Sequence, residues 1–139
     1  MLRRFRTAIR LLLHRVRLQP SLGARGETAA ADYLKRQGYR ILARQQRLRS
    51  GEIDLVALDG QTVVFVEVKT RRSRQKGGPG EAVERSKQRR LTRAATAYLK
   101  RHGLLDCPAR FDVVAVTWPT GDDRPHIEHF QHAFEATGL

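Results

Sequence analysis

Three carboxylates and one lysine stand at alternate positions of two neighbouring apolar segments. They are Glu52, Asp54, Glu67 and Lys69. Alternate residues of a β-strand project from the same face, so two extended segments would bring these four side chains together. Like charges at close range raise each other's pKa and cost stability, and a divalent cation is the usual remedy. Oxygen ligands of this kind suit Mg²⁺, which retains some waters and binds phosphate.

An Asp-Gly pair predicts how the two segments meet. Asp59 and Gly60 separate two runs of β-branched and apolar residues, which is a strong signal for a hairpin. If these two residues form the loop, Asp54 lies opposite Phe65. Asp54 and Glu67 are then diagonal neighbours on one face, with Cα atoms roughly 7–8 Å apart. Both faces of the hairpin carry apolar residues, which predicts a sheet covered on both sides.

The hairpin resembles the D…ExK core of the PD-(D/E)XK nuclease superfamily. Its two strands read GEIDL and FVEVKTR, and from about Gly23 to its end the chain resembles the bacterial YraN-type proteins of the UPF0102 family. Those proteins are similar to archaeal Holliday junction resolvases. The resemblance implies an α/β, restriction-endonuclease-like fold with a mixed central sheet flanked by helices. It also implies a Mg²⁺-dependent endonuclease that hydrolyses phosphodiester bonds in DNA, with branched DNA as one candidate substrate and Mn²⁺ able to replace Mg²⁺.

The resemblance assigns roles to individual residues. Asp54 and Glu67 would bind the metal, helped by the backbone carbonyl of Val68. Lys69 would orient the attacking water, help to deprotonate it and stabilise charge at the phosphate. Two further catalytic candidates, on the expected helices, are Glu27 and Gln88.

Three polar positions near this hairpin have open interpretations. Glu27 is also what the first turn of a helix favours, because the helix dipole stabilises a carboxylate there. Gln45-Gln46 stands where the family usually has an asparagine, so the polar contact of that position is uncertain. Glu52 would tune the metal site or bind a nearby base.

Two other polar features are interpreted as structural. Asp112 lies on a separate expected strand and is not paired in sequence with the acidic cluster. His126, His129 and His132 have a spacing of three that fits one helix face. Their segment follows a proline and is expected to be extended, so we interpret them as surface histidines rather than metal ligands.

The charge of the chain indicates a polyanionic partner. Its 139 residues include 27 Lys+Arg and 14 Asp+Glu, giving a formal net charge of +13. Nucleic acid, most simply DNA, is the expected partner, with an anionic membrane surface or the ribosome as alternatives. The candidate nucleic-acid-binding residues are Arg71, Arg72, Arg74, Lys76 and Lys87. The basic loop that carries most of them would otherwise be a solvated linker.

Cysteine usage and hydropathy limit the setting of the protein. Cys107 is the only cysteine, so a disulfide framework is excluded and a reducing cytoplasm is expected. No apolar run reaches transmembrane length. Residues 1–20 form a basic extension, interpreted as a poorly ordered leader or as a basic amphipathic helix that contacts nucleic acid or membrane.

The remaining pattern predicts one domain over residues 21–139. The expected elements outside the hairpin are a helix over Leu22–Gln37, a strand over Tyr39–Leu48, a helix over Ala82–His102, a strand over Phe111–Trp118 and a short edge strand over Ile127–Phe130. The resemblance to dimeric resolvases implies a homodimer. The competing functional class is a nucleic-acid binding module whose nuclease core is retained but inactive.

Overall fold

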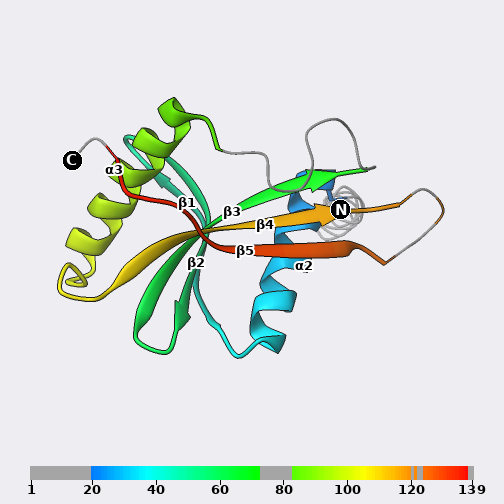
Figure 1. The fold of residues 1–139 in the computed structure, drawn as a ribbon, viewed down its shortest axis with the longest axis horizontal. Helices are drawn as coiled ribbons and strands as arrows, with labels where there is room; N and C mark the ends of the chain where they lie inside the picture. The colour runs from blue at the N-terminus through cyan, green and yellow to red at the C-terminus, as the bar shows by residue number, and fades with distance from the viewer. Residues whose placement is uncertain (1–19, 73–82, 120, 122–123, 138–139) are drawn as a thin grey trace, which may run out of the picture.

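The described part of the chain forms one five-stranded mixed sheet with a helix on each face (Figure 1). The computed structural model describes residues 20–72, 83–119, 121 and 124–137. In chain order the elements are α2 (Leu22–Arg36), β1 (Arg40–Leu48), β2 (Gly51–Asp59), β3 (Thr62–Arg71), α3 (Arg85–Arg101), β4 (Ala109–Thr117) and β5 (His126–Phe134). The predicted α/β class is confirmed, and the extension before Pro20 lies outside the described residues.

The strands follow the order β1-β2-β3-β4-β5 across the sheet. All neighbours are antiparallel except β3 and β4, which are parallel. A parallel pair needs a crossover connection, and α3 lies in it. The carboxyl ends of β3 and β4 therefore reach the same edge of the sheet. Neither described helix is long and apolar enough to cross a membrane.

Each helix buries an apolar stripe against a different face of the sheet. Helix α2 buries Ala30, Ala31 and Leu34 in the cluster that holds Leu55, Val64 and Val66. Helix α3 buries Leu91, Ala94, Ala95 and Tyr98 in the cluster that holds Val56, Val63 and Phe65. These stripes match the helical spacing of the sequence. Gln37, which the sequence placed at the end of this helix, is an exposed cap beyond the last turn of α2.

One glycine lets α2 approach the sheet closely. An added Cβ at Gly26 would lie 1.9 Å from Oγ1 of Thr70, near the end of β3. Only a residue without a side chain fits this contact. The helix begins after Ser21, whose Oγ accepts a hydrogen bond of 3.1 Å from the N–H of Ala24. These two contacts fix the first turns of α2 against the end of β3.

The hairpin forms where it was predicted, but its predicted register is wrong. Asp59 pairs with Thr62, so the two-residue loop is Gly60-Gln61 rather than Asp59-Gly60. Gly60 has a φ of 60°, which a glycine adopts without strain. The pairing shifts by two residues relative to the prediction. Because side chains alternate with a period of two, the shift leaves every residue on its expected face.

The outer strands differ more from the sequence-based expectation. A register shift between Ile41 and Ala43 interrupts β1, so Ile41 packs with the α2-side cluster and Ala43 with the α3-side cluster. The expected edge strand at residues 127–130 is nine residues long, His126–Phe134. It pairs with β4 from Val116 and Thr117 back to Phe111.

Two residues of β5, His129 and His132, take part in a buried polar network around Asp112. Asp112 is fully buried and accepts hydrogen bonds from Arg110 at 3.0 Å and from the backbone N–H of His132 at 3.0 Å. Its other oxygen lies 2.7 Å from Nε2 of His129. Burial alone would raise the pKa of Asp112, but its contacts with His129 and Arg110 outweigh burial and lower it. The structural interpretation of Asp112 therefore agrees with its surroundings.

Candidate active site

The hairpin register brings Asp54 and Glu67 directly opposite each other. The last regular pair before them is Leu55 with Val66, and the next position in the same register is Asp54 with Glu67. Beyond the last regular pair, the backbone N–H of Val68 donates a hydrogen bond of 2.8 Å to Oδ2 of Asp54. Continuation of the register therefore places the two acids opposite each other, in place of the diagonal arrangement expected from the sequence.

The surroundings of Asp54 disfavour its charged form. Burial is the largest cause, followed by the neighbouring carboxylate of Glu67, and together they raise the pKa of Asp54 from 3.8 to about 7. The hydrogen bond from Val68 opposes this rise, while the charge of Glu27 adds to it. A carboxyl group that titrates near neutral pH is unusual and is characteristic of sites where charge is used in chemistry.

Glu67 has a cationic partner from the other side of the site. Its side chain is only 7% exposed and forms an ion pair with Nζ of Lys87, whose side chain is 46% exposed. Lys87 lies in the first turn of α3, which starts at Arg85. A buried carboxylate without a partner would be costly, and this ammonium group is the partner of Glu67. The sequence suggested that Lys87 binds nucleic acid, and its contact with Glu67 was not foreseen.

Glu27 approaches the same cluster from α2. Because the helix begins at Leu22, Glu27 lies beyond its first turn, and the interpretation as a first-turn glutamate is wrong. Its Oε2 accepts a hydrogen bond of 2.8 Å from Nε2 of Gln45 on β1. Gln45 has a φ of 47°, in the left-handed region where asparagine is more common than glutamine. The position that departs from the family pattern therefore holds Glu27 in place.

A cavity of about 260 Å³ lies over the two opposed acids. Its lining residues are Gly51, Glu52, Asp54, Glu67, Lys87, Arg90 and Leu91. Glu52 therefore faces the site, as one of its two interpretations required. Arg90 was not identified from the sequence, because its place in a run of basic residues on α3 gave no sign that it differs from its neighbours.

The other predicted site residues that the structure describes do not line this cavity. Lys69 stands two residues beyond Glu67 on the same face of β3, where its register partner is Ala115 of β4. The amide of Gln88 donates a hydrogen bond of 2.7 Å to the carbonyl of Val83, and Gln88 does not line the cavity. Arg71 and Arg72 lie at the end of β3. The predicted binding residues Arg74 and Lys76 lie outside the described residues.

Comparison with known proteins identifies the family. The model of a family described as the uncharacterised protein family UPF0102 matches residues 26–116, which include every residue of the acidic cluster. The chain belongs to the UPF0102 family. A UPF0102 protein of Geobacter sulfurreducens is 55% identical over 114 residues, covering 82% of this chain and 88% of its own.

Other relatives show similar coverage. A UPF0102 protein of Symbiobacterium thermophilum is 56% identical over 115 residues, covering 83% of this chain and 97% of its own. One from Rhodopirellula baltica is 50% identical over 121 residues, covering 85% of this chain and 72% of its own. The UPF0102 match therefore spans both helices and the hairpin that carries the site.

The oxygen atoms of this UPF0102 protein suit a magnesium ion better than a metal that needs many protein ligands. Within the described ranges, no three His, Cys, Asp or Glu side chains converge to hold a metal ion. Asp54 and Glu67 supply two carboxylates, and the N–H of Val68 faces Asp54. In an extended strand the carbonyl of a residue points to the same side as its N–H. Mg²⁺ binds through one or two carboxylates and keeps several waters, so this set of donors fits it.

Proposed function

We propose that this UPF0102 protein is a metal-dependent endonuclease that hydrolyses phosphodiester bonds in DNA. The observation that supports this function is the pair of opposed acids, Asp54 and Glu67, with a lysine two residues beyond Glu67 on the same face. Burial and, after it, the neighbouring carboxylate of Glu67 raise the pKa of Asp54, so ionising it in this arrangement costs stability. The resemblance of this hairpin to the D…ExK core of the PD-(D/E)XK nucleases supports the same reaction.

In this proposal Asp54 and Glu67 hold Mg²⁺, or Mn²⁺ in its place, with the carbonyl of Val68 as a further oxygen ligand. When bound, the metal lowers the pKa of a coordinated water and polarises a phosphoryl oxygen. Both carboxylates must be ionised to bind a cation. Asp54 therefore loses its proton on binding, and the neutral form that burial favours is the metal-free form.

Lys69 and Glu27 act on the substrate from the two sides of this pair. The ammonium group of Lys69 attracts the phosphate, orients the attacking water and stabilises the charge that develops during displacement. Glu27, held by Gln45, adds a negative charge close enough to raise the pKa of Asp54. We assign Glu27 to hold a water molecule beside the metal ligands.

Lys87 links the resting state of the site to substrate binding. Its ammonium group neutralises Glu67 in this structure, and a bound cation would compete with it. Lys87 is 46% exposed, so its side chain can turn away without opening the core. In the proposal it then contacts a phosphate, which agrees with its prediction as a nucleic-acid-binding residue.

The basic residues around the site would contact the DNA backbone. Arg71 and Arg72 leave the edge of the sheet next to Lys69, and α3 carries a row of arginines in which Arg85, Arg89 and Arg93 are exposed. Repulsion within such a row makes it a poor device for stability. It is suited to neutralising phosphates, which agrees with the net charge of +13.

One observation favours the alternative function, a binding module with an inactive core. The ion pair between Lys87 and Glu67 already satisfies one of the two proposed metal ligands. If this pair persists when Mg²⁺ is present, the site binds DNA without cleaving it. The two functions share the same basic surface and differ only in the use of the acids.

A cleavage assay separates the two functions. Duplex, flap, junction and single-stranded DNA are incubated with the wild type in Mg²⁺, Mn²⁺ or EDTA, beside Glu67→Gln and Asp106→Asn. Asp106 is exposed in the connection before β4, so its change is the matched control for losing one carboxylate. We expect metal-dependent cleavage that Glu67→Gln abolishes and Asp106→Asn retains. Binding without cleavage of any substrate by the wild type would support the inactive core.

A further inference from the structure

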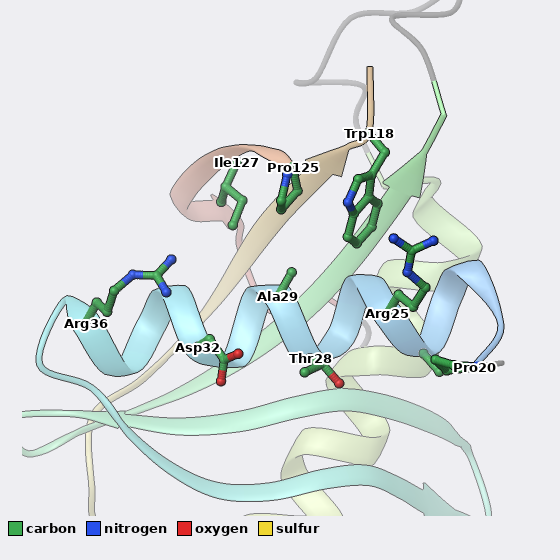
Figure 2. A pocket seen from close by; sticks show the side chains of 10 residues that line it. Pro20, Arg25, Thr28, Ala29, Asp32, Arg36, Trp118, Pro125 and Ile127 are labelled. Carbon is green, nitrogen blue, oxygen red and sulfur yellow. The ribbon is translucent and has the colours of Figure 1, made fainter. Parts of the chain in front are cut away.

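A second cavity, of about 440 Å³, lies on the α2 side of the sheet (Figure 2). Its volume falls within the range of roughly 300–1,000 Å³ that is typical of small-ligand sites. Figure 2 shows Trp118, Pro125 and Ile127 on one side of it and helix α2 on the other. Two arginines of α2, Arg25 and Arg36, stand at its two ends. The proposed nuclease site does not use this cavity.

The cavity contains a buried donor that needs a partner. Within the described residues, Nε1 of Trp118 is buried and has no hydrogen-bond partner. The backbone of the same residue is fixed, because its N–H donates a hydrogen bond of 2.9 Å to the carbonyl of Arg71. Buried donors in folded proteins are nearly always satisfied. The indole therefore lacks one acceptor oxygen or nitrogen, which a ligand can supply.

The walls of the cavity suit a flat ring that carries a negative charge nearby. The guanidinium of Arg25 lies over the Trp118 ring, 4.8 Å from its centroid. Pro125, Ile127 and Ala29 line the space beside the indole with apolar atoms. Aromatic and guanidinium planes are the surfaces on which unstacked bases bind. Purines and pyrimidines also carry the ring nitrogens and carbonyls that an indole N–H can donate to.

The cavity lies at the same edge of the sheet as the acidic site. Lys69 stands near the carboxyl end of β3, and Trp118 follows the carboxyl end of β4, which runs parallel to β3. Arg71 connects them, since it lies two residues beyond Lys69 and its carbonyl accepts from Trp118. The acidic site opens on the α3 side of the sheet and this cavity on the α2 side, so a bound strand would reach both by passing around this edge. The first turns of α2 join the two places as well, with Glu27 toward the acids and Arg25 toward the indole.

We propose that this cavity binds one unpaired nucleobase of the DNA strand that the acidic site acts on. The base lies beside Trp118, accepts a hydrogen bond from its Nε1, and places a neighbouring phosphate near Arg25. This inference rests on the proposed function and narrows it, because a base inside a regular duplex cannot leave its stack without cost. The preferred substrate class is DNA with an unpaired arm rather than continuous duplex.

Trp118 is the only tryptophan of the chain, so its fluorescence reports on this cavity alone. The full chain is titrated in EDTA with three DNA molecules: a duplex with a single-stranded arm, the same molecule with an abasic arm, and a blunt duplex. The abasic arm keeps all phosphates and removes only the bases. We expect the arm with bases to quench Trp118 and to bind about 2- to 13-fold more tightly than the abasic arm, which corresponds to the contribution of about one hydrogen bond.

Variants test the same contact without relying on the fluorophore. The affinity for fluorescently labelled DNA is measured for Trp118→Ala and Arg25→Gln, with Arg101→Gln as control for one lost positive charge at the far end of α3. Arg25→Gln changes an exposed side chain and leaves the core intact. We expect Trp118→Ala to abolish the preference for bases over the abasic arm, Arg25→Gln to weaken the binding of both arms, and Arg101→Gln to change neither.

Three results would overturn the inference, and a fourth would reject only the nuclease. Equal affinity for the two arms with unchanged Trp118 emission would show DNA binding that does not involve the cavity. Quenching that grows with protein concentration without DNA would show that a second copy of the chain covers it. Absence of binding to all three molecules would reject this inference and the proposed function together. Loss of cleavage with quenching retained would reject only the nuclease.

Discussion

Replacing Asp54 by asparagine should stabilise the metal-free protein at high pH. The carboxyl group of Asp54 is partly buried, faces Glu67, and has its pKa raised from 3.8 to about 7. A raised pKa means that the folded state holds the proton to a higher pH than the unfolded state does. Stability is therefore lost as pH rises from about 4 to 7, and the full cost of ionisation is present above pH 7.

The size of the effect follows from the shift in the pKa of Asp54. A rise from 3.8 to about 7 corresponds to about 4 kcal/mol of lost stability at pH 8 and about 1.5 kcal/mol at pH 5. Asparagine carries no charge and removes this cost, and the shift already includes the hydrogen bond from Val68. We expect a gain of about 4 kcal/mol at pH 8 and about 1.5 kcal/mol at pH 5.

Thermal melts of wild type, Asp54→Asn and Asp106→Asn in EDTA at both pH values measure this difference. A gain of about 4 kcal/mol raises the Tm of a domain of this size by about 15 °C. Asp106→Asn changes an exposed carboxylate and should stay within about 0.5 kcal/mol of wild type. Adding Mg²⁺ should stabilise the wild type by mass action and Asp54→Asn less. A lower Tm for Asp54→Asn at pH 8 would refute the reasoning, because it would show that the ionised carboxylate stabilises the fold.

Three further predictions concern the substrate and the scaffold. Lys69→Met should slow cleavage by about 10²–10⁴ while DNA affinity stays within a few-fold. A loss of DNA affinity as large as the loss of cleavage rate would show that Lys69 is an ordinary phosphate contact. The logarithm of DNA affinity should fall with the logarithm of salt concentration, by about 0.9 for each phosphate neutralised. A flat titration would exclude a polyanion-binding surface. Gly26→Ala should lower the stability by about 1–3 kcal/mol, because its Cβ would lie 1.9 Å from Thr70, and an unchanged melt would show that α2 can shift at no cost.

The hairpin shows how far local sequence signals reach. Alternation of apolar and polar residues was enough to predict which face carries Asp54 and Glu67, since a shift of two residues does not change the face. The register itself depended on whether Asp59 belongs to the loop. In the structure Asp59 pairs with Thr62 and accepts a hydrogen bond of 3.0 Å from Nη1 of Arg110. That partner is 51 residues away and cannot be read from the turn sequence.

The edge strand β5 shows a different limit. Its residues read His-Ile-Glu-His-Phe-Gln-His-Ala-Phe, and so many polar side chains suggested only a short strand. Several of them have buried partners: His129 lies against Asp112, and Gln131 donates to the hydroxyl of Tyr39 at 2.9 Å. Polar residues that bind a buried network look, in sequence, like residues exposed to solvent. The strand was underestimated for this reason.

The sequence was sufficient to predict the strand residues of the candidate site. It was not sufficient to predict the contacts that support them. Asp54, Glu67 and Lys69 lie on neighbouring strands joined by one turn, so their proximity follows from local structure. The position of Glu27 near the acids depends on the contact of Gly26 with Thr70. The position of Lys87 depends on the packing of α3 on the other side of the sheet. These are long-range contacts, and the sequence offers no spacing rule for them.

Two aspartates of this sheet, the fully buried Asp112 and the partly buried Asp54, have opposite electrostatic surroundings. Asp112 has hydrogen-bonding partners in Arg110, His129 and the backbone of His132, which lower its pKa despite complete burial. The fold thus gains stability from the charge of Asp112 above the ordinary pKa of an aspartate and loses it as pH falls. Asp54 has one backbone donor and two acidic neighbours, and its pKa moves the other way. A residue retained only for the fold would be expected to resemble Asp112. The surroundings of Asp54 are those that the proposed metal site requires, since a bound cation would add positive charge beyond that of Lys87.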